Sequence, residues 1–128
     1  MTIDEMPAGR KINALIAEKV MSLGREIRLR GETSTVTIYS DNPWWQDGAQ
    51  TQADVVMYGG PKPYSTDIAA AWEVTEKMRA ANWHIELSTC AEMKGPWYCH
   101  FQEATLAYAY ASTAPLAICR AALKAVTP

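Results

Sequence analysis

Apolar residues recur at three- and four-residue spacing in three stretches, residues 9–23, 65–82 and 113–126. This spacing is typical of amphipathic helices, so it predicts three of them. Gly24 is placed to end the first helix, because glycine adopts the left-handed conformation common after a last helical turn. Thr113 is the predicted N-cap of the third.

The second of these helices carries a tryptophan on its predicted core face. Its N-cap is predicted at Ser65 or Thr66, with Asp67 in the first turn, where a carboxylate is favourable. The residues predicted to be buried are Ile68, Ala71, Trp72, Thr75 and Met78. We therefore expect Trp72 to pack against a sheet, so that its replacement by alanine would cost about 3–5 kcal/mol.

Alternating apolar and polar residues predict two groups of strands. Residues 25–40 contain two such runs separated by Gly31-Glu32-Thr33-Ser34, which predicts a β-hairpin. Residues 55–58 are predicted as a third short strand beside the hairpin. Later in the chain, three runs predict an antiparallel meander with turns between them. These three runs are residues 83–88, 97–102 and 106–110, and the turns are residues 93–96 and 103–105.

The predicted order is helix, β-rich segment, helix, three strands, helix. A chain of 128 residues fits one domain. We expect a flexible N-terminal tail over residues 1–8 and a single domain over residues 9–128. Helices with one apolar stripe each need a sheet face to cover. The predicted fold class is therefore α/β (α+β), a three-layer α-β-α sandwich with an antiparallel β-meander flanked by helices.

Three stretches resemble the phage ABA sandwich domain, a family of small α/β proteins of tailed phages and prophages. They are AEKVM (17–21), YSTDIAAAWEV (64–74) and TAPLAICRAALKAV (113–126). The resemblance implies an α-β-α layered fold and a phage origin, and it carries over no catalytic residue. The sequence departs from the short members of the family between Leu23 and Pro61. This β-rich stretch, residues 25–61, is called the insertion below.

The composition narrows the classes of function and location. The net charge is −2, whereas proteins that bind duplex DNA usually carry a basic excess, so nucleic acid is an unexpected partner. Three cysteines do not suggest a disulfide scaffold. The acidic N-terminus does not resemble a signal peptide, and no apolar run approaches the ~20 residues of a membrane span. We expect a soluble protein of the host-cell cytoplasm that does not associate with membranes.

The sequence contains few of the residue patterns that carry catalysis. Its two histidines and many carboxylates match no hydrolase motif, so we expect no catalytic residues and no enzyme activity. His84, Cys90, Cys99 and His100 lie near one another, but their spacing matches no zinc pattern. We therefore expect no metal and no cofactor.

Aromatic residues gather in and beside the insertion, and they are the candidate ligand- or partner-binding site. The adjacent Trp44 and Trp45 cannot easily enter one core, because neighbouring side chains diverge. An exposed ring can stack on a planar ligand, and a basic side chain can meet its charge. The candidate residues are Tyr39, Trp44, Trp45, Tyr58, Tyr64, Lys62, Arg28 and Arg30. The alternative is that the aromatic residues close a second small core or an oligomer interface.

These observations favour a non-enzymatic phage accessory protein. We expect it to bind or sequester a small ligand, such as a host defence signalling nucleotide, or to inhibit a host protein. The alternatives are a nucleic-acid-binding module and a structural interaction protein. The many aromatic residues also predict a homo-oligomer, with residues 39–64 contributing to its interface or to a pocket formed by it.

Overall fold

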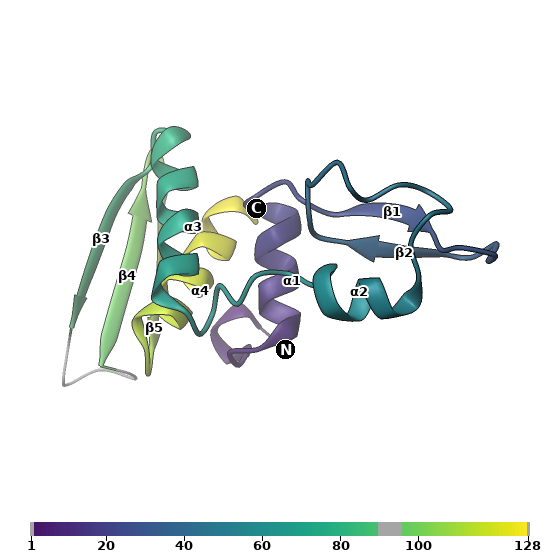
Figure 1. Cartoon of the computed structure of the whole chain (residues 1–128). Helices are drawn as coiled ribbons and strands as arrows, with labels where there is room; N and C mark the ends of the chain where they lie inside the picture. Colours follow the sequence, from purple (N-terminus) through teal and green to yellow (C-terminus); the bar gives the residue numbers. More distant parts are fainter. Residues whose placement is uncertain (1, 90–95, 128) are drawn as a thin grey trace.

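Three strands at the C-terminal end of the chain form one antiparallel sheet, in a computed structural model that describes residues 2–89 and 96–127 (Figure 1). They are β3 (His84–Thr89), β4 (Trp97–Gln102) and β5 (Leu106–Ala111), in the order β3-β4-β5. The predicted meander is confirmed. The backbone N–H of Glu103 donates to the carbonyl of Thr105, which confirms the turn at 103–105. The turn predicted at 93–96 lies largely outside the described residues.

The helices are layered on one face of this sheet. Helix α4 (Ala114–Val126) packs on β4 and β5, and α3 (Ile68–Ala80) lies beside α4 and reaches β3. Helix α1 (Arg10–Lys19) packs against α4, so that sheet, helix pair and α1 follow one another in Figure 1. The predicted α/β (α+β) sandwich with an antiparallel meander is confirmed, with its helices on one face of the meander rather than flanking it. No helix among the described residues is long and apolar enough to cross a membrane.

Buried alanines alternate with larger outward-facing residues along β5, which lets α4 pack directly on the sheet. Ala107, Ala109 and Ala111 are buried, whereas Leu106 and Tyr108 point outward and are exposed. Helix α4 presents alanines in return, and small side chains on both surfaces allow the backbones to come close. The larger side chains of this core include Ile12, Ile16, Tyr64, Val74, Phe101, Ile118 and Leu123.

The prediction for the second helix is partly wrong. Its N-cap is Asp67, whose side chain accepts from the N–H of Ala69, while Ser65 is buried and hydrogen-bonded to Asn13. Trp72 is 48% exposed, and Ile68 is also exposed. The buried face consists of the small and β-branched residues Ala70, Ala71, Val74 and Thr75, together with Met78. Because α3 must fit beside α4 as well as the sheet, Ile68 and Trp72 are turned outward.

The first helix ends earlier than predicted, at Lys19 rather than near Leu23. Ser22 adopts the left-handed conformation with φ 57°. The N–H of Leu23 then donates to the carbonyl of Ala17 at 2.7 Å, which satisfies a carbonyl at the helix end. Gly24, with φ 103°, turns the chain into the insertion rather than ending the helix.

The segment predicted as a flexible tail contacts the core. Residues Ile3–Glu5 form a turn of 3₁₀-helix, and Met6 is buried. The Arg120 guanidinium donates to the carbonyl of Met6 through Nη2 at 2.9 Å and to the carbonyl of Tyr110 through Nη1 at 2.9 Å. One side chain of α4 thereby joins the N-terminal segment to the last residues of β5.

The insertion folds as a small unit of its own. Strands β1 (Arg25–Arg28) and β2 (Thr35–Ile38) pair antiparallel, which confirms the predicted hairpin. The third strand predicted at 55–58 is wrong, because these residues belong to helix α2 (Gln52–Tyr58). A capping box begins this helix: Thr51 N–H donates to the Asp54 carboxylate, and Asp54 N–H donates to the Thr51 hydroxyl.

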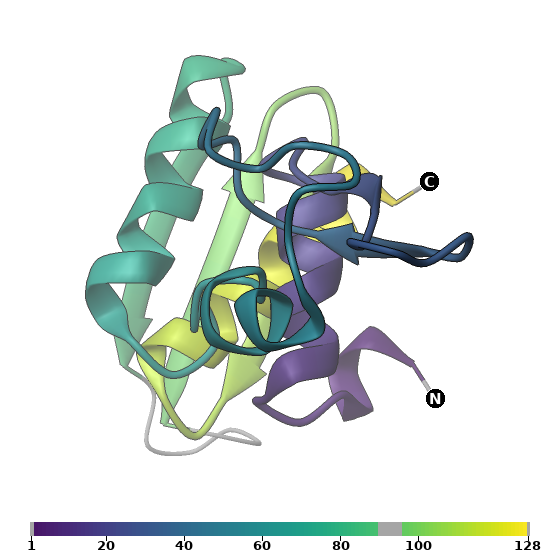
Figure 2. The same ribbon diagram turned by 45° about the vertical axis from the view of Figure 1, so that its right-hand side comes forward.

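A second hydrophobic core lies inside this unit. It consists of Ile27, Leu29, Ile38, Trp45 and Val55, with Val36 packed against it. Figures 1 and 2 show the unit on the side of α1 that faces away from the sheet. Gly59 packs directly against this core. A Cβ at this position would lie 3.1 Å from Cγ2 of Ile38 and 3.2 Å from Cη2 of Trp45, so the position has no room for a larger residue unless its neighbours shift.

Candidate aromatic binding site

The two adjacent tryptophans of the insertion point to different environments. Trp45 is only 3% exposed and fills the core of the insertion, whereas Trp44 is 47% exposed. This confirms that the pair does not enter one core. The Arg25 guanidinium fixes the backbone here, because its Nη2 donates to the carbonyl of Trp45 at 2.6 Å.

Polar side chains hold the loop that presents Trp44. Asn42 Oδ1 accepts from the N–H of Trp44 at 2.9 Å. The buried side chain of Gln50 donates to the carbonyl of Trp44 at 2.7 Å and accepts from the N–H of Gln46 at 2.8 Å. Both backbone polar groups of Trp44 are therefore bonded, and the exposed indole stands on a fixed support.

Three aromatic rings meet at this loop. The ring centroids of Trp44 and Trp45 are 4.9 Å apart at an interplanar angle of 75°, and those of Trp44 and Tyr58 are 6.2 Å apart at 86°. Such edge-to-face pairs are the favourable geometry for aromatic rings. With Ser40 and Asn42, these rings line an open hollow of about 380 Å³, called the aromatic hollow below. Tyr58 is 61% exposed at its rim.

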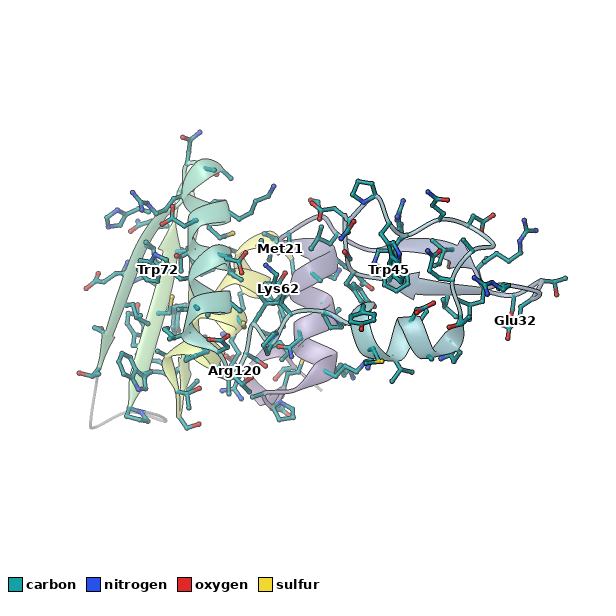
Figure 3. The ribbon with its side chains drawn as sticks, in the orientation of Figure 1. Met21, Glu32, Trp45, Lys62, Trp72 and Arg120 are labelled. Carbon is teal, nitrogen blue, oxygen red and sulfur yellow. The ribbon has the colours of Figure 1, made fainter. Side chains whose placement is uncertain are left out.

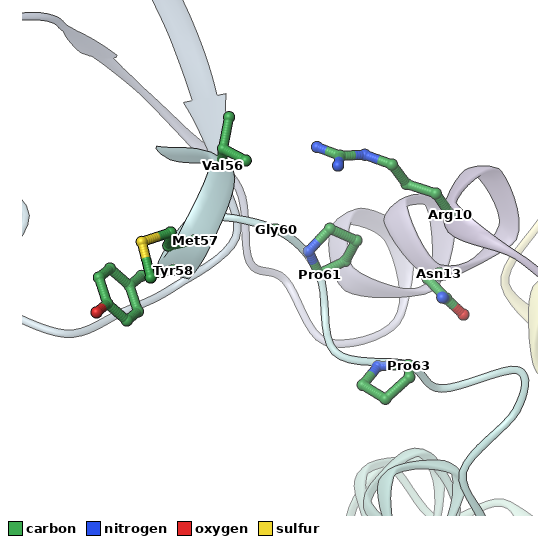
Figure 4. Close-up of a pocket in the computed structure, with 8 residues that line it drawn as sticks. All are labelled: Arg10, Asn13, Val56, Met57, Tyr58, Gly60, Pro61 and Pro63. Carbon is green, nitrogen blue, oxygen red and sulfur yellow. The ribbon is translucent and has the colours of Figure 1, made fainter. Parts of the chain in front are cut away.

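A second hollow of about 360 Å³ lies between α2 and the first turn of α1 (Figure 4). It is lined by Arg10, Asn13, Val56, Met57, Tyr58, Gly60, Pro61 and Pro63. Tyr58 lines both hollows, so the two spaces adjoin at this residue. This second space is called the Arg10 hollow below.

The structure brings together only part of the predicted site. Trp44, Trp45 and Tyr58 meet at the aromatic hollow. Lys62 forms an ion pair with Glu73 on α3 at 2.9 Å instead. Tyr64 belongs to the main core, where burial raises the pKa of its hydroxyl.

The other predicted site residues hold the insertion together. The Arg28 guanidinium pairs with Asp47 at 3.4 Å, and Arg30 donates to the carbonyl of Ala49 at 2.7 Å. The Tyr39 hydroxyl donates to Glu18 on α1 at 3.0 Å. Burial raises the pKa of Tyr39, and the Glu18 carboxylate raises it further. These contacts connect the loop to the hairpin and the insertion to α1.

Most residues that line the two hollows were not among those predicted from the sequence, and Ser40, Asn42 and Arg10 are examples. Asn42 and Ser40 had a local signal, since Asn42-Pro43 directly before Trp44 is typical of an Asx turn. Arg10 had no local sequence signal. It lies beside α2 only in the folded chain, because α2 comes more than forty residues after it in the sequence.

Cysteine and histidine side chains often take part in catalysis or metal binding. Outside the candidate site, Cys99, Cys119 and His100 have structural surroundings. Burial raises the pKa of Cys99 to about 12 and of Cys119 to about 12, so both thiols stay protonated at neutral pH. Nδ1 of His100 lies 2.9 Å from the Tyr98 hydroxyl, and its Nε2 lies 3.4 Å from Glu86. Within residues 2–89 and 96–127, no three His, Cys, Asp or Glu side chains gather as a metal site would require. Cys90 lies outside this range.

A helix-covered β-meander with an aromatic hollow on the insertion defines a small α/β sandwich domain. The model of the phage ABA sandwich domain matches residues 14–123, and the chain belongs to this family. The matched span runs through the whole insertion.

A solved structure supports the same assignment. The chain is similar to a phage protein from Bacillus cereus whose crystal structure is known, with 27% sequence identity and a TM-score of 0.62. The similarity covers 96% of this chain and 95% of that one. No curated protein matches this chain. The family resemblance noted in the sequence is therefore confirmed.

Proposed function

We propose that this phage-family protein is a non-enzymatic binding protein that captures a planar ligand, or a partner with a planar side chain, in the aromatic hollow. The observation that carries the proposal is the exposed indole of Trp44 on a rigid support. An aromatic ring held this way offers stacking area at little entropic cost, because its backbone is already fixed. Stacking on such a ring is worth about 1–3 kcal/mol for a nucleic-acid base.

The surroundings of the charged groups favour binding over catalysis. Asp54 and Asp67 cap helices, and Glu73 forms an ion pair with Lys62. Thiols held protonated by burial are poor nucleophiles. In an infected cell, a protein of this kind would act by occupying its target, for example by sequestering a host defence signalling molecule or by blocking a host protein.

Replacement of Trp44 by alanine is expected to reduce binding by about 5- to 150-fold while the protein stays folded, since the indole supplies contact area but little core packing. The probes are adenosine, guanosine and, for unidentified partners, an extract of infected cells. Calorimetry with the nucleosides and affinity capture from the extract measure the effect, and circular dichroism reports the fold.

Trp72→Ala is the matched control. Trp72 is 48% exposed, nearly the same as Trp44, but it lies on α3 away from the insertion (Figure 3). It should leave binding unchanged. If Trp44→Ala is folded and retains every binding activity of the wild type, the aromatic hollow is not the site.

We also propose that the protein assembles into a homo-oligomer through the insertion. Val56 and Met57 on α2 are both 70% exposed, beside Tyr58 and Trp44. Large apolar side chains exposed close together in this way are typical of an interaction site. A second copy bound to α2 would lie beside the hollows and help to enclose a ligand.

Light scattering at tens of micromolar is expected to give at least twice the chain mass of 14.2 kDa. The double substitution Val56→Glu with Met57→Glu should return the protein to the monomer mass, because it places charges in the proposed interface. A wild-type mass of 14.2 kDa would contradict the proposal.

A further inference from the structure

The Arg10 hollow is lined by hydrogen-bond donors. Arg10 and Asn13 both belong to the first turn of α1, and Figure 4 shows the Arg10 guanidinium extended toward α2 across the hollow. Every other lining residue is apolar, glycine or proline, apart from Tyr58. With no carboxylate in its lining, the hollow suits an anion.

The amide of Asn13 is oriented by the fold. Asn13 is 8% exposed, and its Oδ1 accepts from both the N–H of Ser65 at 2.9 Å and the Ser65 hydroxyl at 2.7 Å. Its acceptor is therefore committed, which leaves the Nδ2 donor as the polar group that Asn13 can offer. No fully buried side-chain N or O within the described residues lacks a hydrogen-bond partner. The Nδ2 atom has no hydrogen-bond partner within the described part of the chain. It is therefore not fully buried and reaches the accessible surface.

The helix end beside the hollow carries excess positive charge. The first turn of α1 contains Arg10 and Lys11 and no acidic residue, and its N-cap, Gly9, has no side chain that could cap it. A helix N-terminus is itself the positive end of the helix dipole. Two cations placed there stabilise α1 poorly but strengthen the local positive potential, and an anion bound there would offset both.

We propose that the two hollows form one site for a nucleotide, a planar base joined to a phosphate. The base would stack on Trp44 in the aromatic hollow, and the phosphate would lie at Arg10 and Asn13 on the other side of Tyr58. The pairing rests on Tyr58, which lines both spaces. It also rests on the proposed function, because the base needs the aromatic hollow. Arg10 thereby takes the phosphate-binding role that the sequence suggested for Lys62, whose ammonium is bound by Glu73.

Calorimetry with matched pairs of ligands tests the inference: adenosine against AMP and guanosine against GMP, with inorganic phosphate as a third probe. For at least one pair, the nucleotide is expected to bind the wild type at least about tenfold more tightly than the nucleoside, since charge-assisted hydrogen bonds supply the difference. Arg10→Gln should abolish this difference and leave nucleoside binding unchanged. Lys11→Gln is the comparison: Lys11 adds to the local positive potential but is exposed and does not line the hollow, so its substitution should weaken nucleotide binding much less than Arg10→Gln does.

Asn13→Asp separates the amide donor from its structural role. The aspartate can still accept from Ser65, but it replaces the Nδ2 donor by a negative oxygen, so nucleotide binding should fall to or below the level of the nucleoside. Thermal melts identify a variant that fails to fold, and Arg10→Gln then stands as the test.

The outcomes separate the two proposals. If the nucleosides and nucleotides bind the wild type equally, or if Lys11→Gln weakens nucleotide binding as much as Arg10→Gln does, the phosphate site is wrong. If no nucleoside or nucleotide binds, but Trp44→Ala loses a partner captured from the extract, the nucleotide inference is wrong and the aromatic site stands. If Trp44→Ala changes no binding at all, the proposed function itself is wrong.

Discussion

Phe101→Ala is expected to lower the free energy of unfolding by about 3–5 kcal/mol. Phe101 is 0% exposed on the central strand β4, and it faces the helices that cover the sheet. Its removal would leave a cavity in the main core, because the close alanine packing of β5 and α4 gives the surroundings little room to collapse. Thermal melts should show a fall in Tm on the order of 10 °C, and urea titration should give the free energy.

Trp72→Ala is the contrasting variant, with an expected cost below about 1 kcal/mol, since half-exposed surface positions contribute little. This value replaces the larger cost expected from the sequence. If Trp72→Ala destabilises the protein as much as Phe101→Ala, the bulky face of α3 is buried after all and the orientation of this helix described above is wrong.

Trp45→Ala is expected to cost a similar 3–5 kcal/mol, but in a different part of the molecule. Trp45 is the largest side chain of the insertion core, and it also supports the indole of Trp44. Its loss should unfold the insertion locally while α4 and the meander keep their structure, because the two cores are separate clusters. Ligand binding should disappear with it.

Hydrogen exchange measured by NMR distinguishes local from global loss. Amides of β1, β2 and α2 should lose protection in Trp45→Ala, and amides of β4 and α4 should keep it. Trp44→Ala, the neighbouring substitution, should leave both groups protected. Equal loss of protection in β4 and α4 would mean that the two cores unfold as one unit.

The meander and its covering helices could be predicted because pattern and burial agree there. Cys99 and Phe101 alternate with polar or half-buried neighbours along β4, and Thr113 caps α4 as expected. Helix α3 shows where the pattern is insufficient. Its apolar residues are spaced so that two overlapping faces both satisfy the helical period, and tertiary contact with α4 selects the face with small residues.

Helix α2 was mistaken for a strand because Val55-Val56-Met57-Tyr58 is rich in residues that favour strands. The local signal that outweighs this preference is Thr51 followed by Asp54, whose side chains cap the first turn reciprocally. Only Val55 of this run is buried, as a helix touching a core along one edge requires.

The candidate site was predictable only as far as it is local. Adjacent tryptophans diverge, so the sequence predicts that one of Trp44 and Trp45 is exposed, and the structure shows that it is Trp44. The other residues that line the hollows could not be predicted, because Arg10 and Asn13 are brought to the insertion by the path of α1. Tyr64 and Lys62 were misplaced for the same reason: they lie close in sequence to the insertion, but the chain has already returned to the main core.

Both ends of the insertion lie near one place on the molecule. Gly24, where the chain enters, lies against the Tyr39 ring, and the N–H of Tyr39 donates to the carbonyl of Gly59, where the chain leaves. A unit with its own core, attached to the domain at neighbouring points, can be replaced without changing the path of the rest of the chain. Recombination between related phages could replace everything from Arg25 to Tyr58, in length and in content, without moving a helix of the sandwich. The main fold would then stay fixed while the surface that the insertion presents changes.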